Sequence, residues 1–190
     1  TVYWRALRDS PGDHVASFQA LDPRSGVRAL HDALPLSNLF PPSEWRAGYF
    51  ARDERRLEIA ANAPPGIYRL EVGIYDFATM VAVPARLGPT GPPQSRILLA
   101  TFRVPPPAVG ADSIGRRQDA RFGSDIRLLG YSIQRASEGK LGVVLFWKTE
   151  RPMSDDYTVS VQLLDGDGKL VAQRDSEPAN AYYPTTVWEP

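Results

Sequence analysis

The run Asp165-Gly166-Asp167-Gly168 is the part of the sequence best suited to binding a metal ion. Carboxylates that alternate with glycines offer the oxygen ligands that Ca²⁺ prefers. The same residue types also form tight turns between two antiparallel strands. Because no glutamate follows at the distal position of a calcium loop, we predict a hairpin turn and no metal site. Calcium binding at Asp165 and Asp167 is the weaker alternative.

Catalytic chemistry has few candidate residues in this chain. Asp32 and Asp175 could form a carboxylate pair for acid–base hydrolysis, but they occupy equivalent positions of the repeat described below. We therefore expect them in separate domains. The chain has two histidines, no cysteine and no G-x-S-x-G motif, which excludes thiolate catalysis and cysteine-based zinc sites. The sequence predicts no catalytic residue, no cofactor and no enzymatic activity.

Aromatic residues are the best candidates for ligand binding. Trp4 and Trp147 lie within strand-like runs, so we expect both in the core. Four other aromatic residues lie in expected loops, where their rings could stack on sugars or anchor the core. We predict ligand binding at Trp45, Trp188, Tyr182 and Tyr183, and sugars are the class of ligand that we expect there.

The apolar pattern indicates strands that position these residues. Apolar residues make up 43% of the chain and charged residues 23%, as in soluble globular proteins. Prolines and glycines separate short runs that alternate apolar and polar residues. We predict an all-β fold with at most one short helical turn. The expected strands are 1–7, 15–21, 57–61, 67–75, 97–104, 126–133, 141–149, 157–164 and 170–173.

Charge and hydropathy exclude two classes of partner. Lysine plus arginine equals aspartate plus glutamate, at 22 each, so no net positive field attracts nucleic acid. No apolar run approaches the roughly 20 residues that cross a bilayer. We expect no nucleic-acid binding and no direct membrane insertion by this segment.

The chain contains an internal repeat with an offset of 143 residues. Residues 1–47 align without a gap with 144–190, and 12 of the 47 pairs are identical. The repeat predicts tandem immunoglobulin-like antiparallel β-sandwich repeats, one largely complete and one truncated. We expect a first repeat over 1–104 that lacks its N-terminal strands, a proline-rich linker over 105–121, and a second repeat over 122–190 that lacks its C-terminal half.

Three runs carry a resemblance to a known family: FGSDIRLLGYSI, the run from LFWKTERP to TTVWEP, and PPGIYRLEVGIYD. They resemble the C-terminal, extracytoplasmic β-sandwich repeats of large glycosyltransferase-family membrane proteins of Chloroflexus-like bacteria. The resemblance implies a position on the periplasmic face or the cell surface, with tethering to the membrane through other segments. It transfers no catalytic residue, because the transferase chemistry of that family lies in a membrane portion.

We therefore predict a non-catalytic extracytoplasmic accessory module that docks protein partners or cell-surface polysaccharide. One alternative is the extracytoplasmic part of a membrane glycosyltransferase that shapes its acceptor site. Another is a structural subunit of a larger membrane or envelope complex, in which a neighbouring chain completes the second repeat by adding a β-strand.

Overall fold

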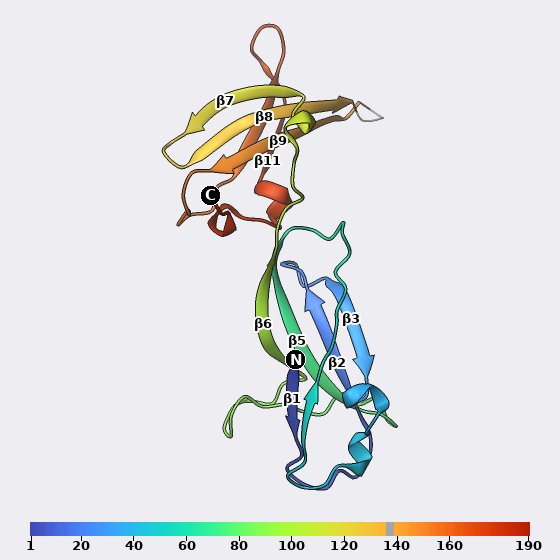
Figure 1. Cartoon of the computed structure of the whole chain (residues 1–190). Helices are drawn as coiled ribbons and strands as arrows, with labels where there is room; N and C mark the ends of the chain where they lie inside the picture. The colour runs from blue at the N-terminus through green and yellow to red at the C-terminus, as the bar shows by residue number, and fades with distance from the viewer. Residues whose placement is uncertain (136–138) are drawn as a thin grey trace. The chain divides into compact units, whose positions relative to one another are not determined.

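The computed structural model describes residues 1–135 and 139–190, and it is all-β, as predicted (Figure 1). The chain forms two compact units, Thr1–Val104 and Pro105–Pro190. Every strand pairing is antiparallel. None of the helices in the described part of the chain is long and apolar enough to span a membrane.

Unit 1 contains two sheets. Strands β1 (Val2–Arg5) and β4 (Phe50–Asp53) form the smaller one. The larger sheet has the order β3-β2-β5-β6, and its strands are β3 (Val27–Ala33), β2 (His14–Leu21), β5 (Gly66–Asp76) and β6 (Arg96–Val104). Strand β2 is therefore an inner strand, hydrogen-bonded along both edges.

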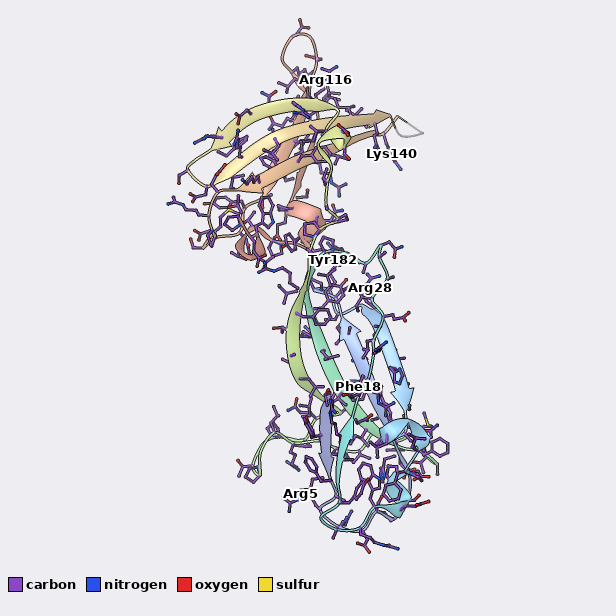
Figure 2. All side chains as sticks on the ribbon, in the orientation of Figure 1. Arg5, Phe18, Arg28, Arg116, Lys140 and Tyr182 are labelled. Atoms are coloured by element: carbon purple, nitrogen blue, oxygen red, sulfur yellow. The ribbon has the colours of Figure 1, made fainter. Side chains whose placement is uncertain are left out.

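The core of unit 1 lies between these sheets. Ala16 and Phe18 of β2 are buried with Val72 of β5, and Phe18, labelled in Figure 2, is only 2% exposed. Val2 and Trp4 of β1 pack against this cluster from the smaller sheet. Ile97 of β6 and Leu57, which lies outside the strands, pack against it as well. Alternate residues of a strand point to one face, which explains why Ala16 and Phe18 share the core.

Unit 2 also contains two sheets. Strands β7 (Arg116–Phe122), β8 (Ile126–Arg135) and β9 (Leu141–Thr149) form one sheet in that order. Strands β10 (Val159–Leu164) and β11 (Leu170–Ser176) form a separate two-stranded sheet.

The structure corrects the expectation of at most one helical turn. Five short 3₁₀ turns occur within residues 1–135 and 139–190, and three of them begin with proline, whose fixed φ suits the first helical position. They are η1 (Pro35–Asn38), η2 (Pro42–Glu44), η3 (Ala111–Ser113), η4 (Pro178–Ala181) and η5 (Thr185–Val187).

Two expected segments also differ from the structure. The linker expected over 105–121 ends earlier, because residues 116–122 form β7. The strand expected at 57–61 is wrong. Leu57 packs against the core without belonging to a strand, and the strand of this region, β4, lies earlier in the chain.

The aligned stretches of the repeat share one local structure. The bounds of β3 and β11 differ by 143 positions, and so do those of η1 and η4, and of η2 and η5. The pairing of β2 with β3 has the same register as that of β10 with β11, including an irregularity at corresponding positions. Residues 143 positions apart can therefore be compared directly. The immunoglobulin-like assignment stays a prediction.

Candidate functional site

Asp165 fixes the turn between β10 and β11. Its Oδ1 accepts hydrogen bonds from the backbone N–H groups of Asp167 (3.0 Å) and Lys169 (2.9 Å). The equivalent Asp22 accepts the same two bonds from Arg24 and Gly26, each at 2.9 Å. This geometry is the hairpin turn that the sequence favoured over a calcium loop. Across the described residues, no three His, Cys, Asp or Glu side chains are grouped as metal ligands would be.

The four loop aromatics do not all lie as a sugar-stacking surface requires. Trp45 and Tyr183 are buried, at 7% and 8% exposure, and Tyr182 and Trp188 are half-buried. The indole Nε1 of Trp45 donates to the carbonyl of Phe40, and that of Trp188 to the carbonyl of Tyr183, both at 3.0 Å. Of the two roles that the sequence left open for these rings, burial favours anchoring of the core for Trp45 and Tyr183. Each indole Nε1 instead secures the loop that precedes it.

The two candidate acidic residues lie in different units. Asp32 lies in β3 of unit 1, and Asp175 lies in β11 of unit 2. Hydrogen bonds from Ser160 and Gln173 lower the pKa of Asp175, so this carboxyl group is held ionised. A general acid needs a raised pKa, so the position of Asp175 is unfavourable for that role.

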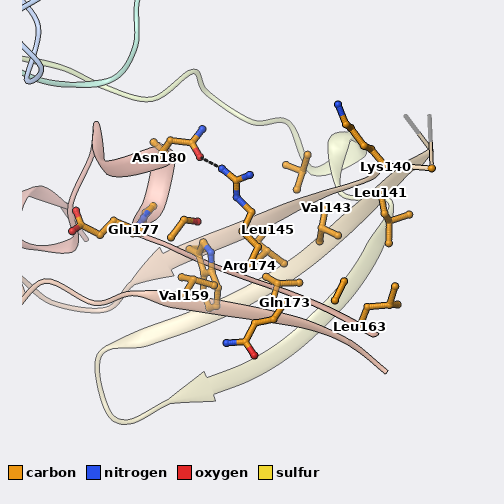
Figure 3. A pocket seen from close by; sticks show the side chains of 18 residues that line it. Lys140, Leu141, Val143, Leu145, Val159, Leu163, Gln173, Arg174, Glu177 and Asn180 are labelled. Carbon is orange, nitrogen blue, oxygen red and sulfur yellow. Dashed lines mark hydrogen bonds between the residues drawn. The ribbon is translucent and has the colours of Figure 1, made fainter. Parts of the chain in front are cut away.

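An open groove with a volume of about 840 Å³ lies in unit 2. Its walls come from β9 and from the sheet of β10 and β11 (Figure 3). The lining is mainly aliphatic, with one indole. Its apolar residues are Leu141, Val143, Val144, Leu145, Trp147, Val159, Val161, Leu163, Ala172, Pro178 and Ala179.

Charged and amide groups line the same groove alongside the aliphatic residues. Lys140, Arg174 and Glu177 lie along it, and the guanidinium of Arg174 hydrogen-bonds the side-chain oxygen of Asn180 at 3.4 Å (Figure 3). The groove is thus an apolar surface with a few polar groups, the usual chemistry of a binding site.

The groove matches the core of unit 1 position by position. Val159, Val161 and Leu163 correspond to Ala16, Phe18 and Ala20, which are all buried. Leu145 and Trp147 correspond to Val2 and Trp4, which pack against that core. Leu163, in contrast, is 46% exposed.

The open groove has a direct structural cause. The core of unit 1 is closed by Leu57, Val72 and Ile97, which lie after the stretch that repeats in unit 2. In unit 1, β5 and β6 extend the sheet of β3 and β2, and their Val72 and Ile97 enlarge the core beside Ala16 and Phe18.

The alternating apolar residues of β10 are a sequence signal for this groove, and the candidate reactive and aromatic residues did not indicate it. Val159, Val161 and Leu163 alternate with polar residues, which predicts one core-facing side. The repeat adds that the covering strands of the first copy have no counterpart among residues 144–190. Together these observations mark an apolar face without its cover.

Comparisons with protein-family models, with curated proteins and with solved structures found no match. The resemblance to glycosyltransferase-associated repeats therefore stays a prediction from the sequence runs.

Proposed function

We propose that this chain is a non-catalytic interaction module that docks a protein partner in the groove of unit 2. The observation that carries the proposal is the partly exposed apolar face of β10, whose counterpart in β2 is buried. An apolar surface gains about 25 cal/mol for each Å² removed from water, so covering this groove favours association. Contiguous exposed apolar surface of this kind is typical of interaction sites.

The lining favours a polypeptide over a polysaccharide as the partner. Sugar sites combine flat aromatic rings with many hydrogen-bonding groups, whereas this groove is lined mostly by valine and leucine, with Trp147 as its one aromatic ring. Aliphatic side chains pack best against other apolar side chains. The rings expected to bind sugar, Trp45 and Tyr183, are buried.

The cellular setting of the proposal comes from the resemblance stated above. It supports a position outside the cytoplasm, as an accessory part of a larger membrane or envelope assembly. A role in shaping the acceptor site of a membrane glycosyltransferase rests on that resemblance alone.

A binding screen tests the proposed function. The full chain is screened in parallel against displayed peptides and against an oligosaccharide array. Enriched peptides should bind Val161→Asp at least about tenfold more weakly, since the new carboxylate lies in the groove. The matched control is Gln162→Asp, which places the same charge on the opposite face of β10 and should leave binding unchanged.

Three results would overturn the proposal. These are binding of oligosaccharides without peptides, equal loss of peptide binding in both variants, and hydrolytic or transferase turnover that survives purification.

A further inference from the structure

Unit 1 has a cavity of its own, at the end of its core where β2 begins. The volume is about 300 Å³, at the lower end of the range for small-molecule sites. His14 and Ala16 line it from the face of β2 that carries Phe18, because alternate residues of a strand share a face. The segment after β1, the turns η1 and η2 (Figure 1) and the end of β5 supply the rest. Lining residues used below are Trp4, Ser10, His14 and Trp45.

The loop between β1 and β2 can be compared with its counterpart in unit 2. Both loops have the same sequence of bends, position by position. The carboxylate of Asp13 accepts a hydrogen bond from the backbone N–H of Ser43 at 2.9 Å. The carboxylate of Asp156 accepts the equivalent bond from Thr186 at 3.0 Å. The two loops therefore hold equivalent residues in the same local structure.

One position of this loop differs in size between the two units. Ser10 lines the cavity, whereas the equivalent Met153 is buried, at 8% exposure. The loop can thus accommodate a long apolar side chain at this position. Because protein interiors pack densely, the shorter serine leaves space that a bound molecule can fill.

The polar groups of the cavity are hydrogen-bond acceptors. The carbonyl of Gly12 can only accept, so Nδ1 of His14, 3.1 Å away, carries the hydrogen and donates it. In the neutral imidazole, Nε2 is then an acceptor. The hydroxyl of Ser10 donates to the same carbonyl at 2.7 Å, which leaves its lone pairs for another partner. A ligand that donates a hydrogen bond matches these groups, and a carboxylate, which only accepts, does not.

Two indoles of the cavity favour an aromatic ligand. Nε1 of Trp4 donates to Asp53 at 3.1 Å, and that of Trp45 donates to a backbone carbonyl at 3.0 Å. Both N–H groups are therefore in use, and the rings offer carbon surfaces on which a planar apolar ring packs. Arg5 and Arg8 also line the cavity, and their positive charge disfavours a cationic ligand.

We propose that the cavity of unit 1 binds a small, neutral aromatic molecule that donates one hydrogen bond, such as a phenol. Nε2 of His14 accepts that bond, and the aromatic ring packs against the indoles of Trp4 and Trp45. This inference goes beyond the proposed function and does not depend on the groove of unit 2.

Titration of the full chain, followed by proton–nitrogen NMR spectra, tests the ligand class. The probes are phenol, benzoate, benzylamine and N-acetyltyrosinamide, the last of which carries the same phenol on a peptide-like backbone. Phenol should shift the amide signals of residues that line the cavity, with a Kd of about 1 mM or lower. Each of the other probes should bind at least about fivefold more weakly, because a charge or a backbone must also enter the cavity.

The variant His14→Phe tests the acceptor. It keeps an aromatic ring but removes Nε2, so the hydroxyl of bound phenol loses its partner. Toluene has the shape of phenol without the donor. The ratio of the toluene Kd to the phenol Kd should therefore fall at least about fivefold in His14→Phe. An unchanged ratio would show that His14 does not accept the bond and would overturn the proposal.

The variant Ser10→Met tests the location, since it transfers the residue of unit 2 into the cavity. The Kd of phenol should rise at least about tenfold, because the longer side chain takes up the space. The matched control is Thr101→Met, which places the same side chain at an exposed position of β6 and should leave the Kd unchanged. If Ser10→Met loses the native spectrum, Ser10→Val, a smaller intrusion, replaces it.

Four other results would overturn the proposal. These are the absence of shifts at the cavity at about ten times the expected Kd, equal weakening by Thr101→Met, unchanged binding in the Ser10 variant, and tighter binding of any other probe than of phenol. Tighter binding of N-acetyltyrosinamide would assign the cavity to a tyrosine side chain of a polypeptide. Peptide binding in the groove of unit 2 is measured with separate variants, so each proposal can fail without the other.

Discussion

At the scale of single residues, Asp22 shows how a buried carboxylate fixes a turn. Burial raises the pKa of Asp22. This effect is outweighed by hydrogen bonds from the backbone N–H groups of Gly26 and Arg24 and from the guanidinium of Arg28, so the pKa lies below its usual range. The Nε of Arg28 lies 2.6 Å from Oδ2. A carboxyl group with a depressed folded pKa stabilises the fold above its unfolded pKa of about 4, and this contribution is lost as the pH falls through the folded value.

Replacement of Asp22 should therefore lower the free energy of unfolding by an amount that depends on pH. At pH 7, Asp22→Asn should lower the free energy of unfolding by about 1–3 kcal/mol, since the amide cannot hold Arg28 as an ion pair. The difference in free energy of unfolding between variant and parent should become smaller as the pH falls below about 4. Urea unfolding between pH 7 and pH 2 measures this. A difference that stays constant over the whole range would contradict the role of ionised Asp22.

Residue types alone do not reveal whether a loop ring is exposed. Trp45 and Tyr183 follow proline-rich 3₁₀ turns that fold their rings inward, where Trp45 packs on Tyr49 with ring centroids 5.4 Å apart. An aromatic residue in a polar loop gives the same sequence signal whether its ring is buried or exposed. The backbone turn that decides between them was not predicted.

At the scale of elements, the turns β2–β3 and β10–β11 provide a reciprocal pair of substitutions. Ser25 has a positive φ of 65°, and the equivalent Gly168 has a φ of 80°. This left-handed region suits glycine and strains other residues. Ser25→Gly should raise the free energy of unfolding by up to about 1 kcal/mol, and Gly168→Ser should lower it by a similar amount.

Thermal and urea unfolding of the two single variants measure the opposite signs. Pro23→Gly at a neighbouring position of the same turn serves as the control, because it adds glycine freedom without relieving a positive φ. Stabilisation by both Pro23→Gly and Ser25→Gly would show that backbone strain at Ser25 is not the cause.

Strands with an alternating apolar face were predictable, whereas a strand with almost no buried residue, such as β7, was not. Strands such as β5 and β10 have a clear period of two, and the sequence predicted both within a few residues. Strand β7 begins Arg-Arg-Gln-Asp and is almost wholly exposed, so it has no apolar period to detect. Pairing with β8 makes it a strand, and such long-range pairing is not visible in local sequence.

At the scale of the whole molecule, the repeat carries more information than any local motif. It predicted that the second copy lacks the strands that complete the first, and hence that strand addition from a neighbour was one possible role. It did not identify the groove residues, because that step needs the register of β10 with β11. With the register known, the groove residues Val159, Val161 and Leu163 of β10 have buried counterparts in unit 1.

Because β2 is buried and the equivalent face of β10 is partly exposed, equivalent substitutions should lower the free energy of unfolding by unequal amounts. Phe18 is 2% exposed and packs with Ala16 and Val72, so Phe18→Ala should lower the free energy of unfolding of unit 1 by about 3–5 kcal/mol. Val161→Ala, at the equivalent position of the open groove, should cost less than about 1 kcal/mol, since its side chain is only half-buried. Urea unfolding of the full chain, followed by amide exchange in each unit, measures both. Equal costs for Phe18→Ala and Val161→Ala would mean that the groove residues are as well covered as the core of unit 1.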